Sequence, residues 1–177
     1  IDGNLQLSAG TFTASPFTTT LSGSWTKGAN ATFNHSSGSV TLDGTDQTIS
    51  GSTVFHNLSK TVTTAQTLTF ESTSTTSVSG ALTLQGGGLL QLLSLRASNS
   101  SVSSLLTLDT GGSQTLQFLD VQRSNASGGQ ELNCTSCTDN GNNLNWAFST
   151  PSIVGTFFLD AGQTPAGANV DISVSFN

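Results

Sequence analysis

The stretch Val40-Thr41-Leu42-Asp43-Gly44 decides the fold, because degenerate copies of it recur along the chain. It is echoed by Leu82-Thr83-Leu84-Gln85-Gly86 and by Leu106-Thr107-Leu108-Asp109. Two of the copies continue alike, through Gln47-Thr48-Ile49 and Gln114-Thr115-Leu116. Self-similarity at uneven intervals of roughly 14 to 28 residues is typical of a solenoid, in which each coil repeats the same turn and insertions fall in loops.

Apolar and polar residues alternate within each copy, and the same alternation occurs at residues 4–7, 67–70 and 114–118. This period of two, with β-branched threonine on the polar side, is typical of a half-buried strand. The runs end in Gly, Asp, Asn or Ser, which turn the chain. No stretch keeps a helical spacing of apolar residues for three turns. We therefore predict an all-β chain.

The fold class that these repeats predict is a parallel β-helix, or β-solenoid, over residues 1–148. With a coil of about 22 residues we expect six or seven coils, and strands stacked about 4.8 Å apart give a rod roughly 30 Å long. A β-sandwich is the alternative, since it also has short strands with frequent turn signals. The unequal repeats of a single motif favour the solenoid.

The composition is that of a folded, nearly uncharged chain. Of its 177 residues 34% are hydrophobic and only 8% charged, while serine and threonine number 28 each. Disordered chains combine low hydrophobicity with high net charge and many prolines, whereas this chain has a net charge of −6 and three prolines. Its four cations, Lys27, Lys60, Arg96 and Arg123, are too dispersed to bind nucleic acid. No apolar run is long enough to span a membrane.

Residues 23–148 carry a set of short motifs in a fixed order. They are Gly23-Ser24-Trp25, then residues 31–35, 38–44 and 47–58, and finally residues 124–129 and 138–148, the last ending in Asn145-Trp146-Ala147-Phe148. Together they resemble a bacterial secreted β-solenoid repeat of large surface and adhesin-like proteins. The resemblance implies secretion, a β-helical rod and a place in a long surface protein. It implies no catalytic residue and no particular ligand.

The C-terminal segment, residues 149–177, differs from the rest in composition. Residues 149–152 are expected to form a linker, and residues 153–160 and 169–176 two strands. An isolated two-stranded ribbon is marginal in water, so the apolar side formed by Val170, Ile172, Val174 and Phe176 needs a cover. Either the segment opens a further module that packs on the rod, or it donates a strand to a neighbouring copy. Repeated head-to-tail donation would give a filament.

Cys134 and Cys137 form a lone CxxC pair, at a place where the resembling sequences usually have polar residues. A zinc site needs four ligands, and the two histidines, His35 and His56, are expected on distant strands. A redox site would need a βαβ context, which the pattern lacks. We therefore predict a small-loop disulfide and an oxidising compartment, with free buried thiols or an intermolecular bridge as the alternatives.

The Asn-rich stretch after this pair offers side-chain oxygens in a tight turn. Asp139, Asn140 and Asn142 are weak calcium candidates, because the stretch has one carboxylate and lacks the spacing of a known calcium loop. The alternative is a turn formed by Gly and Asn residues. Trp146 and Phe148, just beyond it, are expected to cap the end of the apolar core.

The function expected from these observations is an extracellular or cell-surface structural role: an adhesin rod or filament subunit whose partners are copies of itself or further modules. We expect no enzyme, because the aspartates Asp43 and Asp46 fit turn positions better than an acid–base pair. Two alternatives stay open. A carbohydrate-binding module would recognise surface glycans by stacking on Trp25, and an ice-binding solenoid would use threonine pairs such as Thr18/Thr20 and Thr67/Thr69. The uneven repeat spacing argues against threonines in register.

Overall fold

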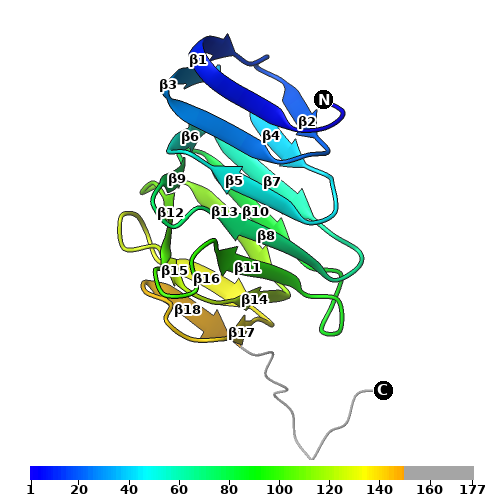
Figure 1. Ribbon diagram of the computed structural model, residues 1–177. Helices are drawn as coiled ribbons and strands as arrows, with labels where there is room; N and C mark the ends of the chain where they lie inside the picture. The colour runs from blue at the N-terminus through cyan, green and yellow to red at the C-terminus, as the bar shows by residue number, and fades with distance from the viewer. Residues whose placement is uncertain (150–177) are drawn as a thin grey trace, which may run out of the picture.

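The computed structural model describes residues 1–149, and every regular element within them is a β-strand. The strands form three sheets in which all strand pairs are parallel. Figure 1 shows the coils stacked from β1 at one end of the molecule to β17 and β18 at the other. The predicted parallel β-helix is thus confirmed. The β-sandwich alternative is wrong, because the sheets of a sandwich are antiparallel.

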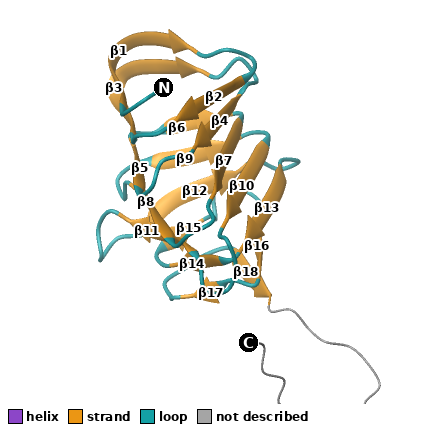
Figure 2. Ribbon diagram, turned by 90° about the vertical axis from the view of Figure 1, so that its right-hand side faces the viewer, coloured by secondary structure: helices purple, strands orange, loops and turns teal. Residues whose placement is uncertain are grey.

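The three sheets form the walls of the solenoid (Figure 2). Sheet 1 contains β1 (Leu5–Thr13), β3 (Trp25–Asn34), β5 (Gln47–Ser50), β8 (Gln66–Phe70), β11 (Leu93–Ala97), β14 (Leu119–Val121) and β17 (Thr138–Asp139). Sheet 2 contains β2 (Thr18–Leu21), β4 (Ser39–Leu42), β7 (Asn57–Thr61), β10 (Ala81–Gln85), β13 (Ser113–Gln117), β16 (Leu132–Thr135) and β18 (Trp146–Ser149). Sheet 3 contains β6 (Thr53–Phe55), β9 (Thr75–Val78), β12 (Ser104–Leu108) and β15 (Ser124–Asn125).

Sheets 1 and 2 each have seven strands, so the described part contains seven coils, within the predicted range. The coils differ in length. Stacked side chains on neighbouring strands of sheet 2 are 18 residues apart at Ser39 and Asn57, but 32 apart at Gln85 and Gln117. The extra residues lie in loops, such as the one between β10 and β11, whose tip carries the exposed Leu89 and Leu90. The strands therefore keep their register although the coil length varies.

The core is a single column of apolar side chains that runs through the coils. It is made of inward-facing leucine, valine, isoleucine and phenylalanine, one or two per strand, such as Val40 and Leu42 on β4 and Leu82 and Leu84 on β10. Outward-facing residues of the same strands are mainly threonine and serine. Since the backbone bonds to the coils above and below and each strand presents only one apolar face, few charged residues are needed at the surface.

An aromatic cluster fills the core of the first three coils. The Trp25 ring lies edge-on to Phe33, with ring centroids 4.7 Å apart, and to Phe55, at 4.9 Å. Phe12 on β1 stacks on Phe33 at 6.0 Å. Edge-to-face and offset arrangements at these distances are the favourable ones for aromatic pairs. The cluster packs the N-terminal end of the column, where sheet 3 contributes a single strand, β6, which carries Phe55.

The last described strand, β18, ends at Ser149, one residue beyond the expected end of the solenoid at residue 148. The expected linker and two strands of residues 150–177, with Val170, Ile172, Val174 and Phe176, lie outside the described residues.

Candidate functional site

The outward face of sheet 2 is the most regular surface in the described part of the chain. Its central column holds one hydroxyl side chain per strand on five successive strands, in register: Thr20, Thr41, Ser59, Thr83 and Thr115. A second column follows Thr61, Gln85, Gln117, Thr135 and Ser149. No outward position of β2, β4, β7, β10, β13, β16 or β18 carries an ionisable or aromatic side chain.

These columns correct the expectation about threonines. We expected uneven repeat spacing to put threonines out of register, but register depends on the strands alone, and the insertions leave it unchanged. The threonine pairs that the sequence suggested do not form one face: Thr18/Thr20 lie on β2 of sheet 2, and Thr67/Thr69 on β8 of sheet 1. The column is instead built from single threonines or serines on successive strands.

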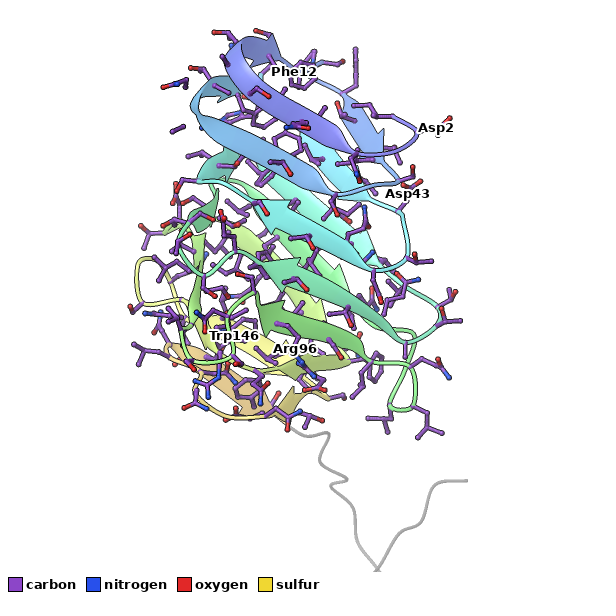
Figure 3. The ribbon with its side chains drawn as sticks, in the orientation of Figure 1. Asp2, Phe12, Asp43, Arg96 and Trp146 are labelled. Atoms are coloured by element: carbon purple, nitrogen blue, oxygen red, sulfur yellow. A yellow bond between two sulfur atoms is a disulfide. The ribbon has the colours of Figure 1, made fainter. Side chains whose placement is uncertain are left out.

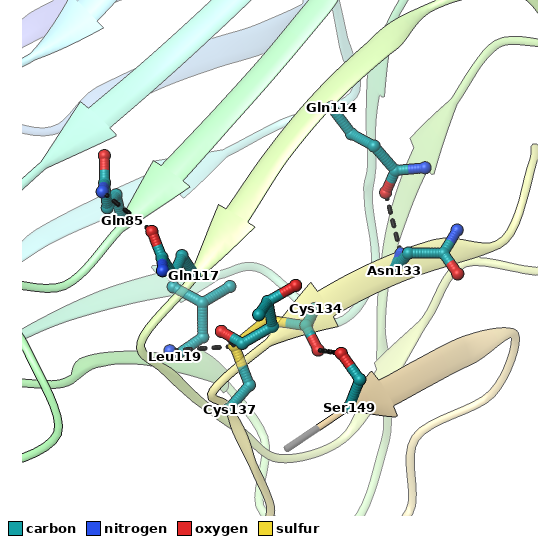
Figure 4. The surroundings of a disulfide bond; sticks show 9 residues. Gln85, Gln114, Gln117, Leu119, Asn133, Cys134, Cys137 and Ser149 are labelled. Carbon is teal, nitrogen blue, oxygen red and sulfur yellow. Dashed lines mark hydrogen bonds between the residues drawn. A yellow bond between two sulfur atoms is a disulfide. The ribbon is translucent and has the colours of Figure 1, made fainter. Parts of the chain in front are cut away.

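A shallow groove of about 270 Å³ interrupts the face between β13 and β16. Along these strands the Asn133 N–H donates to the side-chain oxygen of Gln114 at 2.8 Å, and Gln117 pairs with Thr135. The Gln85 amide donates to the Gln117 oxygen at 3.2 Å (Figure 4). The groove is lined by Gln114, Thr115, Leu116, Gln117, Asn133 and Thr135. Amide and hydroxyl groups of this kind can hold water or a neutral polar ligand, but they supply no general acid or base.

The two histidines lie close together, in the turns that follow β3 and β6. The rings of His35 and His56 stack with centroids 5.5 Å apart and planes 22° from parallel. The Ser37 N–H donates to Nδ1 of His35 at 3.0 Å, so the proton of neutral His35 lies on Nε2. That tautomer has no free lone pair for a metal. Among residues 1–149 no three His, Cys, Asp or Glu side chains are grouped as metal ligands would be.

The predicted disulfide between Cys134 and Cys137 is confirmed. It closes the turn between β16 and β17, and Cys134 faces the core with 1% of its surface exposed. The Leu119 N–H lies 3.2 Å from Sγ of Cys137, and the Ser149 hydroxyl lies 3.3 Å from the Cys134 carbonyl oxygen (Figure 4). The disulfide therefore closes a turn that hydrogen bonds join to the coil before it and to the last strand.

Replacing both cysteines with serine is expected to lower the free energy of unfolding by about 2 kcal/mol, the loop-closure value for so short a loop. The bridged residues are only three apart in sequence, so the solenoid should still fold. Thermal denaturation of this variant against the oxidised parent measures the loss. If a reducing agent shifted the melting temperature of the serine variant as much as that of the parent, the disulfide would not be the cause.

The Asn-rich turn uses its side chains to close itself. Oδ1 of Asp139 accepts the Gly141 N–H at 2.8 Å and the Asn143 amide at 2.6 Å. The Asn140 amide points instead to Asp120 on the previous coil, at 2.6 Å. Asn142 has a φ of 60°, a left-handed conformation that asparagine tolerates. The Asp139 carboxylate thus closes the turn itself, and the Asn140 amide bonds to the previous coil.

Trp25 is not available to a sugar, and the prediction that it stacks on glycans is wrong. Its side chain is 1% exposed and its Nε1–H donates to the Thr53 hydroxyl at 3.1 Å, inside the aromatic cluster. Stacking on a sugar requires a ring with one open face, which this ring lacks.

Trp146 and Phe148 lie where an end cap was expected. Both belong to β18, pack partly buried against the core, and stack with centroids 5.8 Å apart and planes 11° from parallel. Figure 3 shows Trp146 at the opposite end of the rod from Phe12. Nε1 of Trp146 is buried without a hydrogen-bond partner among the described residues.

A buried lysine is the feature that the sequence missed. Lys60 occupies an inward position of β7, is fully buried, and donates from Nζ to Gly44 O at 2.8 Å, Thr45 O at 2.9 Å and Gln47 Oε1 at 2.7 Å. Burial lowers the pKa of Lys60 from 10.5 to about 8, although Asp46 and Asp43 oppose the shift. Asp46 itself accepts the Thr67 N–H at 2.7 Å, in keeping with the expected turn role.

Comparison of the chain with protein-family models, with curated proteins and with solved structures gives no match. Within residues 1–149 no helix has the length and apolarity needed to cross a membrane.

Proposed function

We propose that this chain is an extracellular structural rod, of the kind found in surface adhesins, that joins copies of itself or further modules of the same polypeptide through its two ends. The proposal rests on a difference between the strands inside the rod and the strands at its two ends. Inner strands of sheets 1 and 2 pair on both edges, whereas β1, β2, β17 and β18 are terminal strands of their sheets. Unpaired strand edges are templates for a further strand.

Each end also has a partly buried aromatic side chain on its terminal strand. Phe12 is on β1 at one end of the rod, and Trp146 is on β18 at the other (Figure 3). Phe17, next to β2, is 79% exposed. Edge hydrogen bonds together with buried aromatic area are the usual means by which strands add to a sheet. A contact between unlike ends does not close on itself, so it would extend into a filament.

The chemistry of the described part supports a mechanical rather than a catalytic role. Arg96 and Asp120 on sheet 1 form an ion pair with each other. The disulfide fits an oxidising compartment, because such bridges are rare in reducing ones. Surface adhesins and extracellular filaments work in such a compartment.

Deleting residues 150–177 is expected to abolish assembly if that segment provides the joining strand. Negative-stain electron microscopy and analytical ultracentrifugation of the purified full chain and of the deletion variant make the comparison. We expect linear assemblies from the full chain and single rods from the variant. Unchanged assembly would rule out strand donation, and single rods from both would overturn polymerisation of this chain on its own.

Adding charge to the β1 edge is a second, independent test. Thr11→Lys with Thr13→Lys places two ammonium groups on exposed positions of this terminal strand. Natural proteins use lysines on edge strands to prevent edge-to-edge pairing. We expect shorter or no assemblies and an unchanged melting temperature. Ser101→Lys with Thr110→Lys, two exposed turn positions on either side of β12, adds the same charge as a matched control and should assemble normally. Equal loss in both variants would point to net charge rather than the edge.

A further inference from the structure

The outward face of sheet 2 repeats across its strands and, on β2 and β4, also along them. Across the strands, the column from Thr20 to Thr115 places one hydroxyl group at each step of about 4.8 Å, the distance between hydrogen-bonded strands. Along a strand, outward positions recur about every 6.6 Å. Thr18 and Thr20 on β2, and Ser39 and Thr41 on β4, fill two such positions each. A surface with this repeat matches a partner that is itself a lattice.

From this repeat we propose that the outward face of sheet 2 binds ice. Both repeat distances are close to those of oxygen atoms in hexagonal ice. A threonine side chain offers a hydroxyl group that bonds water and a methyl group that confines it, so a regular array of threonine and serine can hold a first water layer in lattice positions. The β-helix makes the array rigid, because each hydroxyl column rests on paired backbone strands.

The absence of charge from this face favours ice over other partners. Ammonium and carboxylate groups orient water around themselves, whereas the outward positions of sheet 2 carry only hydroxyl, amide and methyl groups. They also carry no aromatic ring, the platform on which proteins stack sugars, so a crystalline polysaccharide fits the face less well. The core of a protein–protein interface is enriched in aromatic residues, methionine and arginine, and the outward positions of β4, β7 and β10 carry none of these.

Sheet 1 gives an internal contrast. Its outward column runs from Thr48 through Thr69 to Arg96, and a neighbouring column passes through Ser94 to Asp120. Arg96 and Asp120 bond to each other across the coils. The same solenoid thus has one face with in-register neutral residues and one face interrupted by an ion pair. Only the first is suited to ordered water.

The test replaces one threonine at the centre of each face. Thr83→Tyr on β10 and Thr41→Tyr on β4 put a bulky ring into the sheet 2 array, and Thr69→Tyr on β8 makes the same change on sheet 1. Thermal hysteresis by nanolitre osmometry and inhibition of ice recrystallisation are the readouts. We expect the parent and Thr69→Tyr to shape ice crystals and to delay their growth. The two sheet 2 variants should lose that delay while keeping their circular dichroism and melting temperature.

Three results would overturn the proposal. The parent protein, purified as the full chain, could leave ice growth unaffected at the highest soluble concentration. Thr69→Tyr could lose as much activity as Thr83→Tyr, in which case the face is not the site. Retention on crystalline cellulose or chitin that depends on Thr83, without any effect on ice, would assign the face to a polysaccharide. None of these readouts depends on head-to-tail assembly, since Thr11→Lys with Thr13→Lys leaves the face intact and should keep the ice activity.

Discussion

Replacing Trp25 with alanine is expected to lower the free energy of unfolding by about 3–5 kcal/mol, the usual loss for a buried tryptophan. The ring is 1% exposed, touches Phe33 and Phe55 edge-on, and donates its Nε1–H to Thr53. Removal would leave a large cavity in the first three coils and an unused acceptor on the Thr53 hydroxyl. Guanidinium chloride denaturation, followed by far-ultraviolet circular dichroism, gives the difference.

One further variant separates the packing of the Trp25 ring from its hydrogen bond, and another serves as a control for an exposed ring. Trp25→Phe keeps an aromatic ring but lacks the donor to Thr53, so it should lose less stability than Trp25→Ala. Phe17→Ala removes a ring that is 79% exposed and should change stability by no more than about 0.5 kcal/mol. A Trp25→Ala protein with parent stability would contradict the buried position of the ring. For the same reason, loss of glycan binding in a Trp25 variant would report unfolding rather than a sugar site.

The sequence predicted the fold because the fold depends on a pattern that a sequence displays. Alternation as in Val40-Thr41-Leu42 identifies strands, and recurrence of the same run identifies stacked coils. The disulfide was predictable for a similar reason, since Cys134 and Cys137 are three residues apart and no other ligands accompany them. In each of these cases the information is local.

The properties that the sequence did not predict depend on which residues meet between coils. His35 and His56 are 21 positions apart in the chain yet stack, because they leave neighbouring coils at the same corner. The column from Thr20 to Thr115 became visible only once the loops were separated from the strands. An uneven spacing in sequence hides an even spacing in space, since an insertion such as the loop at residues 86–92 lengthens the coil without moving the next strand out of register.

Lys60 shows the limit of the alternation pattern. Residues 57–61 alternate correctly, with Leu58 and Lys60 inward, but a lysine at an inward position contradicts the rule that the core is apolar. It is tolerated because three acceptors surround Nζ: two carbonyl oxygens from the loop that follows β4 and the oxygen of Gln47. Gln47 is in turn held by Leu21 O at 3.0 Å and Gly23 O at 2.6 Å. The network therefore ties the first three coils together at one corner.

Raising the pH from 8 to 10.5 is therefore expected to stabilise the protein. In the unfolded chain the lysine pKa is 10.5, and in the fold burial lowers the pKa of Lys60 to about 8. Between these values the unfolded state holds a proton that the folded state has released, so the free energy of unfolding rises with pH. A shift of this size corresponds to at most about 3 kcal/mol across the window. Below pH 8 both states are protonated, and Lys60 contributes no slope.

Few other groups obscure this window, because the chain has no tyrosine and Cys134 and Cys137 are bridged. Lys60→Met should abolish the rise, while Lys27→Met, which removes the other lysine, should keep it. Urea denaturation curves at several pH values between 7 and 10.5 for the three proteins give the slopes. If the parent and Lys60→Met had equal slopes, the Lys60 ammonium would be as well solvated in the fold as in the unfolded chain, and the buried network at this corner would be wrong.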